Sequence, residues 1–193
     1  PLSGTWTVQS ESLKASRTTT TGQLPGGEPA HSIREITLRA EEDFMLTGLG
    51  QNGEGSGEVV FVGYGIDNGP DGYNNLEGLD SLEGKVAVMF RFEPMNADGQ
   101  SQWAERGWSG RAGFANKVGA VAGLDPEGII IINPPGSADN RANRLSRFQG
   151  RAQADAPVMM MSYEAGDNML KAMGSDMTMR SEEHTSELQS HAP

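Results

Sequence analysis

The chemistry open to this chain is limited first by its imidazoles and thiols. It has three histidines and no cysteine, so thiol catalysis and thiolate zinc sites are excluded. His184 and His191 lie in a polar C-terminal tail, which leaves His31 alone in a turn-rich region. A catalytic zinc site or a Ser-His-Asp triad would need more imidazoles or partners from elsewhere. We therefore interpret His31 as a solvated loop residue.

Paired carboxylates are a second source of chemistry. Glu41 and Glu42 are adjacent, and Glu77 lies shortly before Asp80. Two carboxyl groups can act as acid and base when their surroundings separate their pKa values. Nothing in the neighbouring sequence supplies a third partner or a buried cleft, so both pairs are interpreted as solvated charge.

Two glycine-containing loops resemble ligand motifs weakly. Gly48, Gly50 and Gly53 have G-x-G-x-x-G spacing, but they precede a predicted strand, whereas a dinucleotide site needs them between a strand and a helix. A flexible turn is the favoured interpretation.

A faint calcium-loop pattern occupies residues 67–78. Asp67 and Asp71 hold acidic positions one and five, and Gly72 holds position six. Position twelve is Gly78, so the bidentate glutamate that anchors calcium is absent. An Asx-rich turn is favoured, and weak binding of an ion at the Asp67 to Asp71 loop stays open.

Aromatic and guanidinium side chains gather between a predicted strand and the next helix. The candidates for substrate or interdomain contact are Arg91, Trp103, Arg106, Trp108 and Arg111. Tryptophan and arginine are enriched at binding hot spots. The alternative is that both indoles cap the edge of the sheet.

The elements that position these residues follow an α/β pattern. Continuous apolar runs predict strands buried on both faces at residues 58–62, 86–90, 129–132 and 156–161. Phe114, Val118, Val121 and Ala122 share one helical face. A helix between two such strands predicts that residues 86–90 and 129–132 lie parallel and adjacent. Methionines 159–161 are expected to be core residues.

The flanking segments are expected to be less regular. Short β-like runs at residues 6–9 and 33–38, separated by the threonine run at 18–21 and a turn-rich stretch, predict hairpins at a sheet edge. Residues 137–154 predict a surface loop. Ser162 is the expected N-cap of a short helix, with Glu164 in its first turn.

Composition narrows the classes of partner. The net charge of -11 and a pI of about 4.7 disfavour nucleic acid and anionic lipid, which attract basic surfaces. The longest aliphatic run, residues 129–132, is too short to cross a bilayer.

Four ordered segments resemble a protease-associated (PA) domain. They are GEVVFVGYGI at residues 57–66, LEGKVAVMFRFEP at 82–94, the helix and strand at 117–134, and APV at 156–158. The approach to the first segment, Asp43-Phe-Met-Leu and a glycine-rich loop, is similar to the PA domain inserted in bacterial zinc aminopeptidases. These enzymes are relatives of glutamate carboxypeptidase and the transferrin receptor. Residues 124–128, LDPEG, depart from the Ala/Gly-rich turn usual there.

The resemblance implies an α/β PA fold, a small open β-sandwich or barrel with flanking short helices. It implies a PA domain at residues 43–179, and the β-rich segment predicted by the hairpin pattern at residues 1–42 leads into it. It further implies a non-catalytic part of an exported, extracellular or periplasmic zinc aminopeptidase. This part would act in substrate access or protein contact, and its partners would be the peptidase domain and a peptide or protein substrate. The family's zinc ligands have no counterpart here, so no catalytic or metal residue is transferred, and zinc is expected in the parent alone.

A second hypothesis places the same module in a different class of protein. It would be a PA-type binding domain of a subtilisin-like protease or of a sorting receptor. Sequence beyond residue 179 would separate the two hypotheses, because a zinc peptidase carries His-x-Asp and Glu-Glu motifs.

The C-terminal tail, residues 180–193, resembles a translated sequencing adapter. The string RSEEHTSELQS at residues 180–190 carries this likeness. The tail is expected to be non-native, with a natural sequence of about 179 residues cut from a larger enzyme.

Overall fold

The computed structural model describes residues 5–9, 12–23, 29–146, 148 and 150–172. The proposed non-native tail at residues 180–193, with His184 and His191, lies outside the described residues, as does the end of the expected PA domain.

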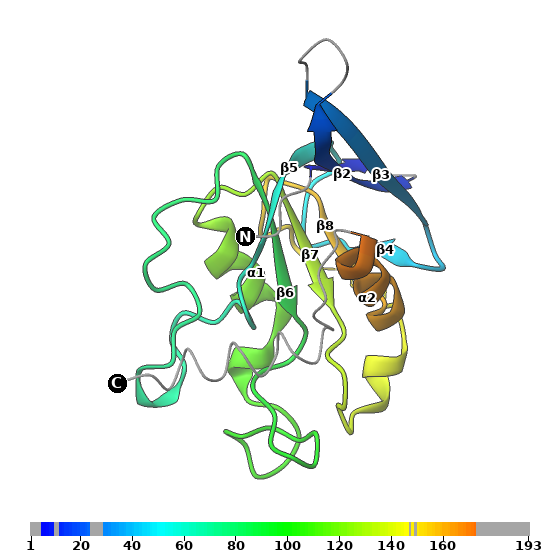
Figure 1. The fold of residues 1–193 in the computed structure, drawn as a ribbon. Helices are drawn as coiled ribbons and strands as arrows, with labels where there is room; N and C mark the ends of the chain where they lie inside the picture. The colour runs from blue at the N-terminus through cyan, green and yellow to red at the C-terminus, as the bar shows by residue number, and fades with distance from the viewer. Residues whose placement is uncertain (1–4, 10–11, 24–28, 147, 149, 173–193) are drawn as a thin grey trace.

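One mixed sheet carries the fold (Figure 1). Its eight strands lie in the order β3-β2-β1-β5-β6-β7-β8-β4. They span β1 Thr5–Gln9, β2 Ser12–Gln23, β3 Pro29–Arg39, β4 Phe44–Leu46, β5 Gly55–Phe61, β6 Lys85–Phe90, β7 Gly128–Ile132 and β8 Val158–Met161. The helices are α1 Phe114–Ala122 and α2 Tyr163–Ala172, with short 3-10 turns η1 Pro70–Gly72, η2 Gly110–Ala112 and η3 Asn140–Asn143. The α/β fold class is therefore confirmed.

The centre of the sheet is parallel and its flanks are antiparallel. Strands β5, β6, β7 and β8 run parallel, with Val88 opposite Ile130 and Ile130 opposite Met159. Strand β1 joins β5 antiparallel and β4 joins β8 antiparallel. The predicted parallel pairing of β6 and β7 across helix α1 is confirmed.

Strand alternation divides the core into two clusters. Even-numbered residues of β6 and β7, such as Val88 and Ile130, belong to the cluster that contains Met169 of α2. Odd-numbered residues, such as Met89 and Ile131, pack in the cluster that contains Val118 of α1. The two helices therefore cover opposite faces of the parallel strands, as Figure 1 shows. Methionines 159–161 are fully buried, as predicted.

The two ends of the sheet are joined by a short connection. Strand β3 ends at Arg39 and β4 begins at Phe44, with a bridge between Ala40 and Phe44. Leu38 and Phe44 share one core cluster. The sheet therefore curls so that its first and last strands approach each other.

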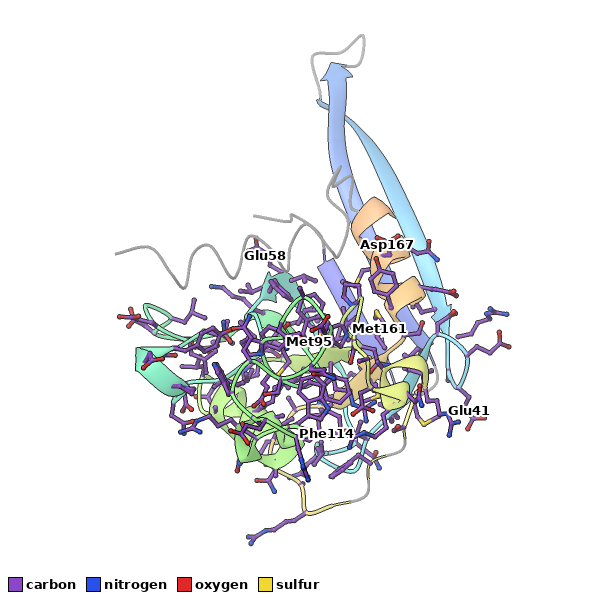
Figure 2. The ribbon with its side chains drawn as sticks, turned by 90° about the horizontal axis from the view of Figure 1, so that it is seen from below. Glu41, Glu58, Met95, Phe114, Met161 and Asp167 are labelled. Carbon is purple, nitrogen blue, oxygen red and sulfur yellow. The ribbon has the colours of Figure 1, made fainter. Side chains whose placement is uncertain are left out.

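The β2 and β3 hairpin extends away from the body of the molecule (Figure 2). Within that body Met95 and Met161 lie inside, and Glu41 lies at its periphery.

The N-terminal predictions are confirmed in part. Strands form over residues 5–9 and 29–39, and the β2 and β3 hairpin forms one end of the sheet. The interpretation of His31 as a loop residue is wrong: it lies in β3, opposite Thr20 of β2. The threonine run at residues 18–21 does not separate strands but is itself part of β2, because β-branched residues suit a paired strand.

Close backbone approach sets the glycine-rich loop before β5 and the start of β5 itself. A Cβ at Gly50 in the loop would overlap the carbonyl oxygen of Ala156, and one at Gly55, where β5 begins, would overlap that of Glu127. No helix follows Gly53, since the chain enters β5 at Gly55. The interpretation of the G-x-G-x-x-G spacing as a turn agrees with this backbone.

No described helix has both the length and the apolar character needed to cross a membrane.

Candidate functional site

Polar side chains concentrate where the parallel strands end. The chain leaves β5 through a loop at residues 62–69, leaves β6 through a long loop at residues 91–113, and leaves β7 through a loop at residues 133–157. Ligands in open α/β sheets bind at this edge, beyond the carboxyl ends of the strands. These three loops therefore form the candidate site.

Lys117 of α1 lies in the interior, with 1% of its surface exposed. Its Nζ donates hydrogen bonds to the carbonyl oxygen of Phe90 at 2.6 Å and to that of Phe92. It also lies 5.7 Å from the centre of the Tyr64 ring. Burial lowers the pKa of Lys117 well below its usual value, and the nearby Glu93 carboxylate opposes this shift. The amine thus joins α1 to the end of β6.

Glu93 holds the ends of the long loop together. The residue is fully buried, and its Oε1 accepts hydrogen bonds from the Ser101 hydroxyl and from the Ser109 backbone N–H at 2.8 Å. Its Oε2 accepts from the Ser109 hydroxyl. Ser101 Oγ in turn accepts from the backbone N–H of Trp103 and of Ala104. One carboxylate therefore closes residues 94–109 into a defined loop.

Arg91 is a structural cation, with 6% of its surface exposed. Its Nη1 donates to Asn133 Oδ1 at 3.3 Å and to the Arg141 carbonyl oxygen at 2.8 Å. Burial, with a smaller contribution from Arg141, lowers the pKa of Arg91 to about 10. The guanidinium joins the loop after β6 to the loop after β7, so it is not part of an open surface.

Phe92 adopts a strained backbone conformation that its surroundings enforce. Its φ is +69°, a left-handed value that bulky residues rarely adopt. Trp108 stacks on the Phe92 ring at 4.3 Å between centroids, and the guanidinium of Arg91 lies 4.8 Å from the same ring. Lys117 holds the carbonyl of Phe92. The stack and the bond to Lys117 together fix the start of the loop.

Trp108 also connects the two loops. Its indole Nε1 donates to Asp139 Oδ2 at 2.7 Å, and Asp139 forms a salt bridge with Arg141 at 2.6 Å. The hydrogen bond with Arg141 is the largest cause that lowers the pKa of Asp139, and the Trp108 bond lowers it further. A cavity of about 370 Å³ lies beside this contact, lined in part by Arg106, Trp108 and Asp139.

Trp103 packs inside the same loop. Its ring meets Tyr73 edge to face at 5.0 Å between centroids, and it packs against the core cluster that contains Phe90. Both indoles are therefore partly buried, Trp103 against the core cluster and Trp108 between Phe92 and Asp139.

Arg111 lies apart from the other four predicted contact residues. Its Nε donates to the carbonyl oxygen of Asn68 at 2.7 Å, and it lines a cavity of about 540 Å³ between the loop after β5 and helix α1. Arg106 and Trp108 share the other cavity. The five residues therefore do not form one site. Arg91 links two loops in the interior, Trp103 packs on Tyr73, and the other three line two separate cavities.

Sequence reasoning missed Glu93, Lys117 and Asp139. Lys117 had a signal, since it lies three residues after Phe114 and shares the apolar face of α1. A lysine on a buried face must find hydrogen-bond acceptors. Glu93 had a weaker signal, because it follows a buried strand almost at once. Asp139 gave none, since its partner Trp108 is 31 residues away.

Among the residues that the structure describes, no group of three or more His, Asp or Glu side chains is placed to hold a metal ion. The Asp67 to Asp71 loop contains η1, and Asp71 has a φ of +55°, as an Asx-rich turn allows.

A scan against models of known protein families finds no match for this chain, and a search of curated proteins finds no matching relative.

Proposed function

We propose that this chain supplies a PA-type domain, with a PA fold that curls into a small open barrel, to an exported zinc aminopeptidase. Its role there is non-catalytic: it shapes access of a peptide substrate or contacts the peptidase domain. The observation that carries the proposal is the arrangement of the four PA-like segments. They form β5, β6, α1 with β7, and β8, adjacent in one sheet and in chain order.

The polar interior supports a scaffold role. Glu93, Lys117 and Arg91 direct their hydrogen bonds to loop hydroxyls, a side-chain amide and backbone groups. Groups committed in this way hold loops in place, as a domain that presents a surface requires. The curl that joins β3 to β4 supports the barrel-like description of the fold.

The surface assigned to contact is the packed loop around Trp108. Arg106 is exposed and lies beside the cavity of about 370 Å³, and the half-buried Trp108 lies between Phe92 and Asp139. Rigid aromatic residues with an arginine nearby suit binding, because little conformational entropy is lost on contact.

Hydrogen exchange of the intact parent enzyme tests the contact role. Binding of a peptide-like inhibitor should slow amide exchange within residues 95–111, compared with residues 114–122 of α1 as an internal reference. Unchanged exchange in the loop would contradict the contact role.

Zinc analysis of the purified 193-residue chain tests the non-catalytic role. The chain should hold only trace zinc and release no amino acid from a chromogenic aminopeptidase substrate. Stoichiometric, tightly held zinc would overturn the proposal. Gene sequence beyond residue 179 should encode His-x-Asp and Glu-Glu motifs, whereas a serine nucleophile context or a membrane span would favour the second class of parent.

A further inference from the structure

The cavity beside Arg111 holds opposite charges that do not pair with each other. Asp67 and Arg111 both line this space of about 540 Å³. Both side chains are exposed, and in the described part of the chain no ion pair or hydrogen bond links them. Two charges of opposite sign in one cavity, with no ion-pair partner among the described residues, are complementary to a ligand that carries both signs.

The walls of the cavity are fixed by backbone geometry. Gly63 and Gly65 have φ values of +55° and +64°, and Asn75 Oδ1 accepts the Tyr64 N–H at 3.0 Å, so the loop after β5 is defined. On the opposite wall, Asn116 Nδ2 donates to the carbonyl of Gly110 at 3.0 Å. The cavity is therefore preformed, which reduces the entropy lost when a ligand binds.

Arg111 is oriented and still has donors available. Its Nε donates to the Asn68 carbonyl, and no described residue accepts a hydrogen bond from its two terminal nitrogens. A guanidinium held in this way presents its remaining N–H groups as a fork that suits a carboxylate. Asp67 supplies an acceptor for an ammonium group on the same cavity.

The neighbouring cation does not compete for this role. Lys117 also lines the cavity, but its Nζ donates to the carbonyls of Phe90 and Phe92. Its amine therefore belongs to the interior. Charge recognition in the cavity rests on Arg111 and Asp67.

We infer that this cavity binds a small zwitterion, an amino acid or dipeptide with a free ammonium and a free carboxylate. Arg111 binds the carboxylate and Asp67 binds the ammonium. The volume lies within the range of small-ligand sites, about 300 to 1,000 Å³. Ile66 and Ala120, which also line it, provide apolar contact for a side chain. A simple anion would meet the repulsion of Asp67, and a simple cation that of Arg111.

Calorimetry of the 193-residue chain with alanyl-leucine tests the inference. Binding at millimolar affinity or tighter is expected, and the N-acetylated and C-amidated forms should bind roughly tenfold more weakly, because each loses one charge-assisted contact. Free leucine is the second arm: if it binds as well as the dipeptide, the ligand is an amino acid, and if it binds more weakly, the ligand is a dipeptide. Equal affinity for the blocked and unblocked forms would overturn the inference, as would no heat of binding from either free ligand at about 10 mM.

Two variants assign the contacts. R111Q should bind the unblocked dipeptide roughly tenfold more weakly than the unsubstituted chain does, but the C-amidated dipeptide equally well, because that ligand has no carboxylate to lose. D67N should likewise bind the unblocked dipeptide roughly tenfold more weakly and the N-acetylated dipeptide equally well. R151Q and D80N remove matched exposed charges outside the cavity and should bind as the unsubstituted chain does. The assay uses this chain alone, so a negative binding result would not contradict the PA-type role. A parent enzyme of another class would likewise not contradict ligand binding in the cavity.

Discussion

Replacing Lys117 with methionine should destabilise the domain by about 3 kcal/mol. Methionine matches the lysine side chain up to Cε and lacks the amine, so the carbonyl oxygens of Phe90 and Phe92 lose a partner in the interior. Each buried acceptor left unsatisfied costs about 1 to 3 kcal/mol. Removal of the buried amine recovers part of its desolvation cost, so the net loss lies below the sum.

Thermal unfolding followed by circular dichroism measures this loss. In a domain of this size, 1 kcal/mol shifts Tm by roughly 2 to 4 °C, so Tm should fall by about 6 to 12 °C. K85M is the matched control, because Lys85 is half-buried and its side chain has no described partner. It should change Tm by less than about 2 °C. If the Tm of K117M fell no further than that of K85M, the hydrogen bonds of Lys117 that join α1 to the end of β6 would not stabilise the fold.

The cost of K117M should also depend on pH. Burial lowers the folded-state pKa of Lys117 below the unfolded value of 10.5. Below the folded pKa the amine is charged in both states, and its desolvation opposes folding. As the pH rises from that value towards 10.5, the unfolded chain binds more protons than the folded one, so stability increases. The Tm difference between the unsubstituted chain and K117M should therefore widen from neutral to alkaline pH, and a constant difference would contradict the lowered pKa.

Three further substitutions probe the loops and the sheet. E93Q should cost about 1.5 to 3 kcal/mol and speed amide exchange at Trp103 and Ala104, because it weakens charge-assisted bonds that close the loop; unchanged exchange would contradict this role. D139N should destabilise the fold at neutral pH, because the hydrogen bond with Arg141 lowers the folded-state pKa of Asp139 below the unfolded value of 3.8. Its effect should begin to decrease as the pH falls below about 3.8 and should be lost once the pH is also below the folded-state pKa, where both states are protonated. G55A should lower the free energy of unfolding by about 1 to 3 kcal/mol, because its Cβ would overlap a backbone carbonyl. G53A should change it by less than about 0.5 kcal/mol, because its Cβ would meet Pro157 at an ordinary van der Waals distance.

The sequence predicted the elements whose own residues determine them. Strands β6 and β7 are apolar on both faces, and Phe114, Val118 and Val121 form a helical face, so their pairing followed from the rule for crossovers. Strand β2 was missed because its threonine-rich pattern gives no alternation of apolar and polar residues. Its pairing with β3, and with it the strand position of His31, depends on a partner that a local pattern does not reveal.

The candidate site was less predictable because its contacts join distant segments. Trp108 was a candidate from its residue type, but its bond to Asp139 spans 31 residues. Arg91 was expected at a contact surface, yet its position directly after a buried strand carries it inside, where the Asn133 side chain and the Arg141 carbonyl accept its hydrogen bonds. Residue type identified the groups that could bind a ligand, and tertiary packing decided which of them remain available.

That distinction explains why the inferred ligand cavity centres on Arg111. Lys117 has the more unusual environment, and a strongly shifted pKa in a cavity wall often marks a functional group. Its donors, however, are committed to two carbonyl oxygens at 2.6 Å or closer, so a ligand would have to displace both bonds. The Arg111 side chain donates its Nε to Asn68 and lines the cavity, and none of the described residues accepts a hydrogen bond from its terminal nitrogens. Binding at Arg111 breaks no described contact, so recognition there costs the fold little, and variants at Lys117 and Arg111 should separate stability from ligand affinity.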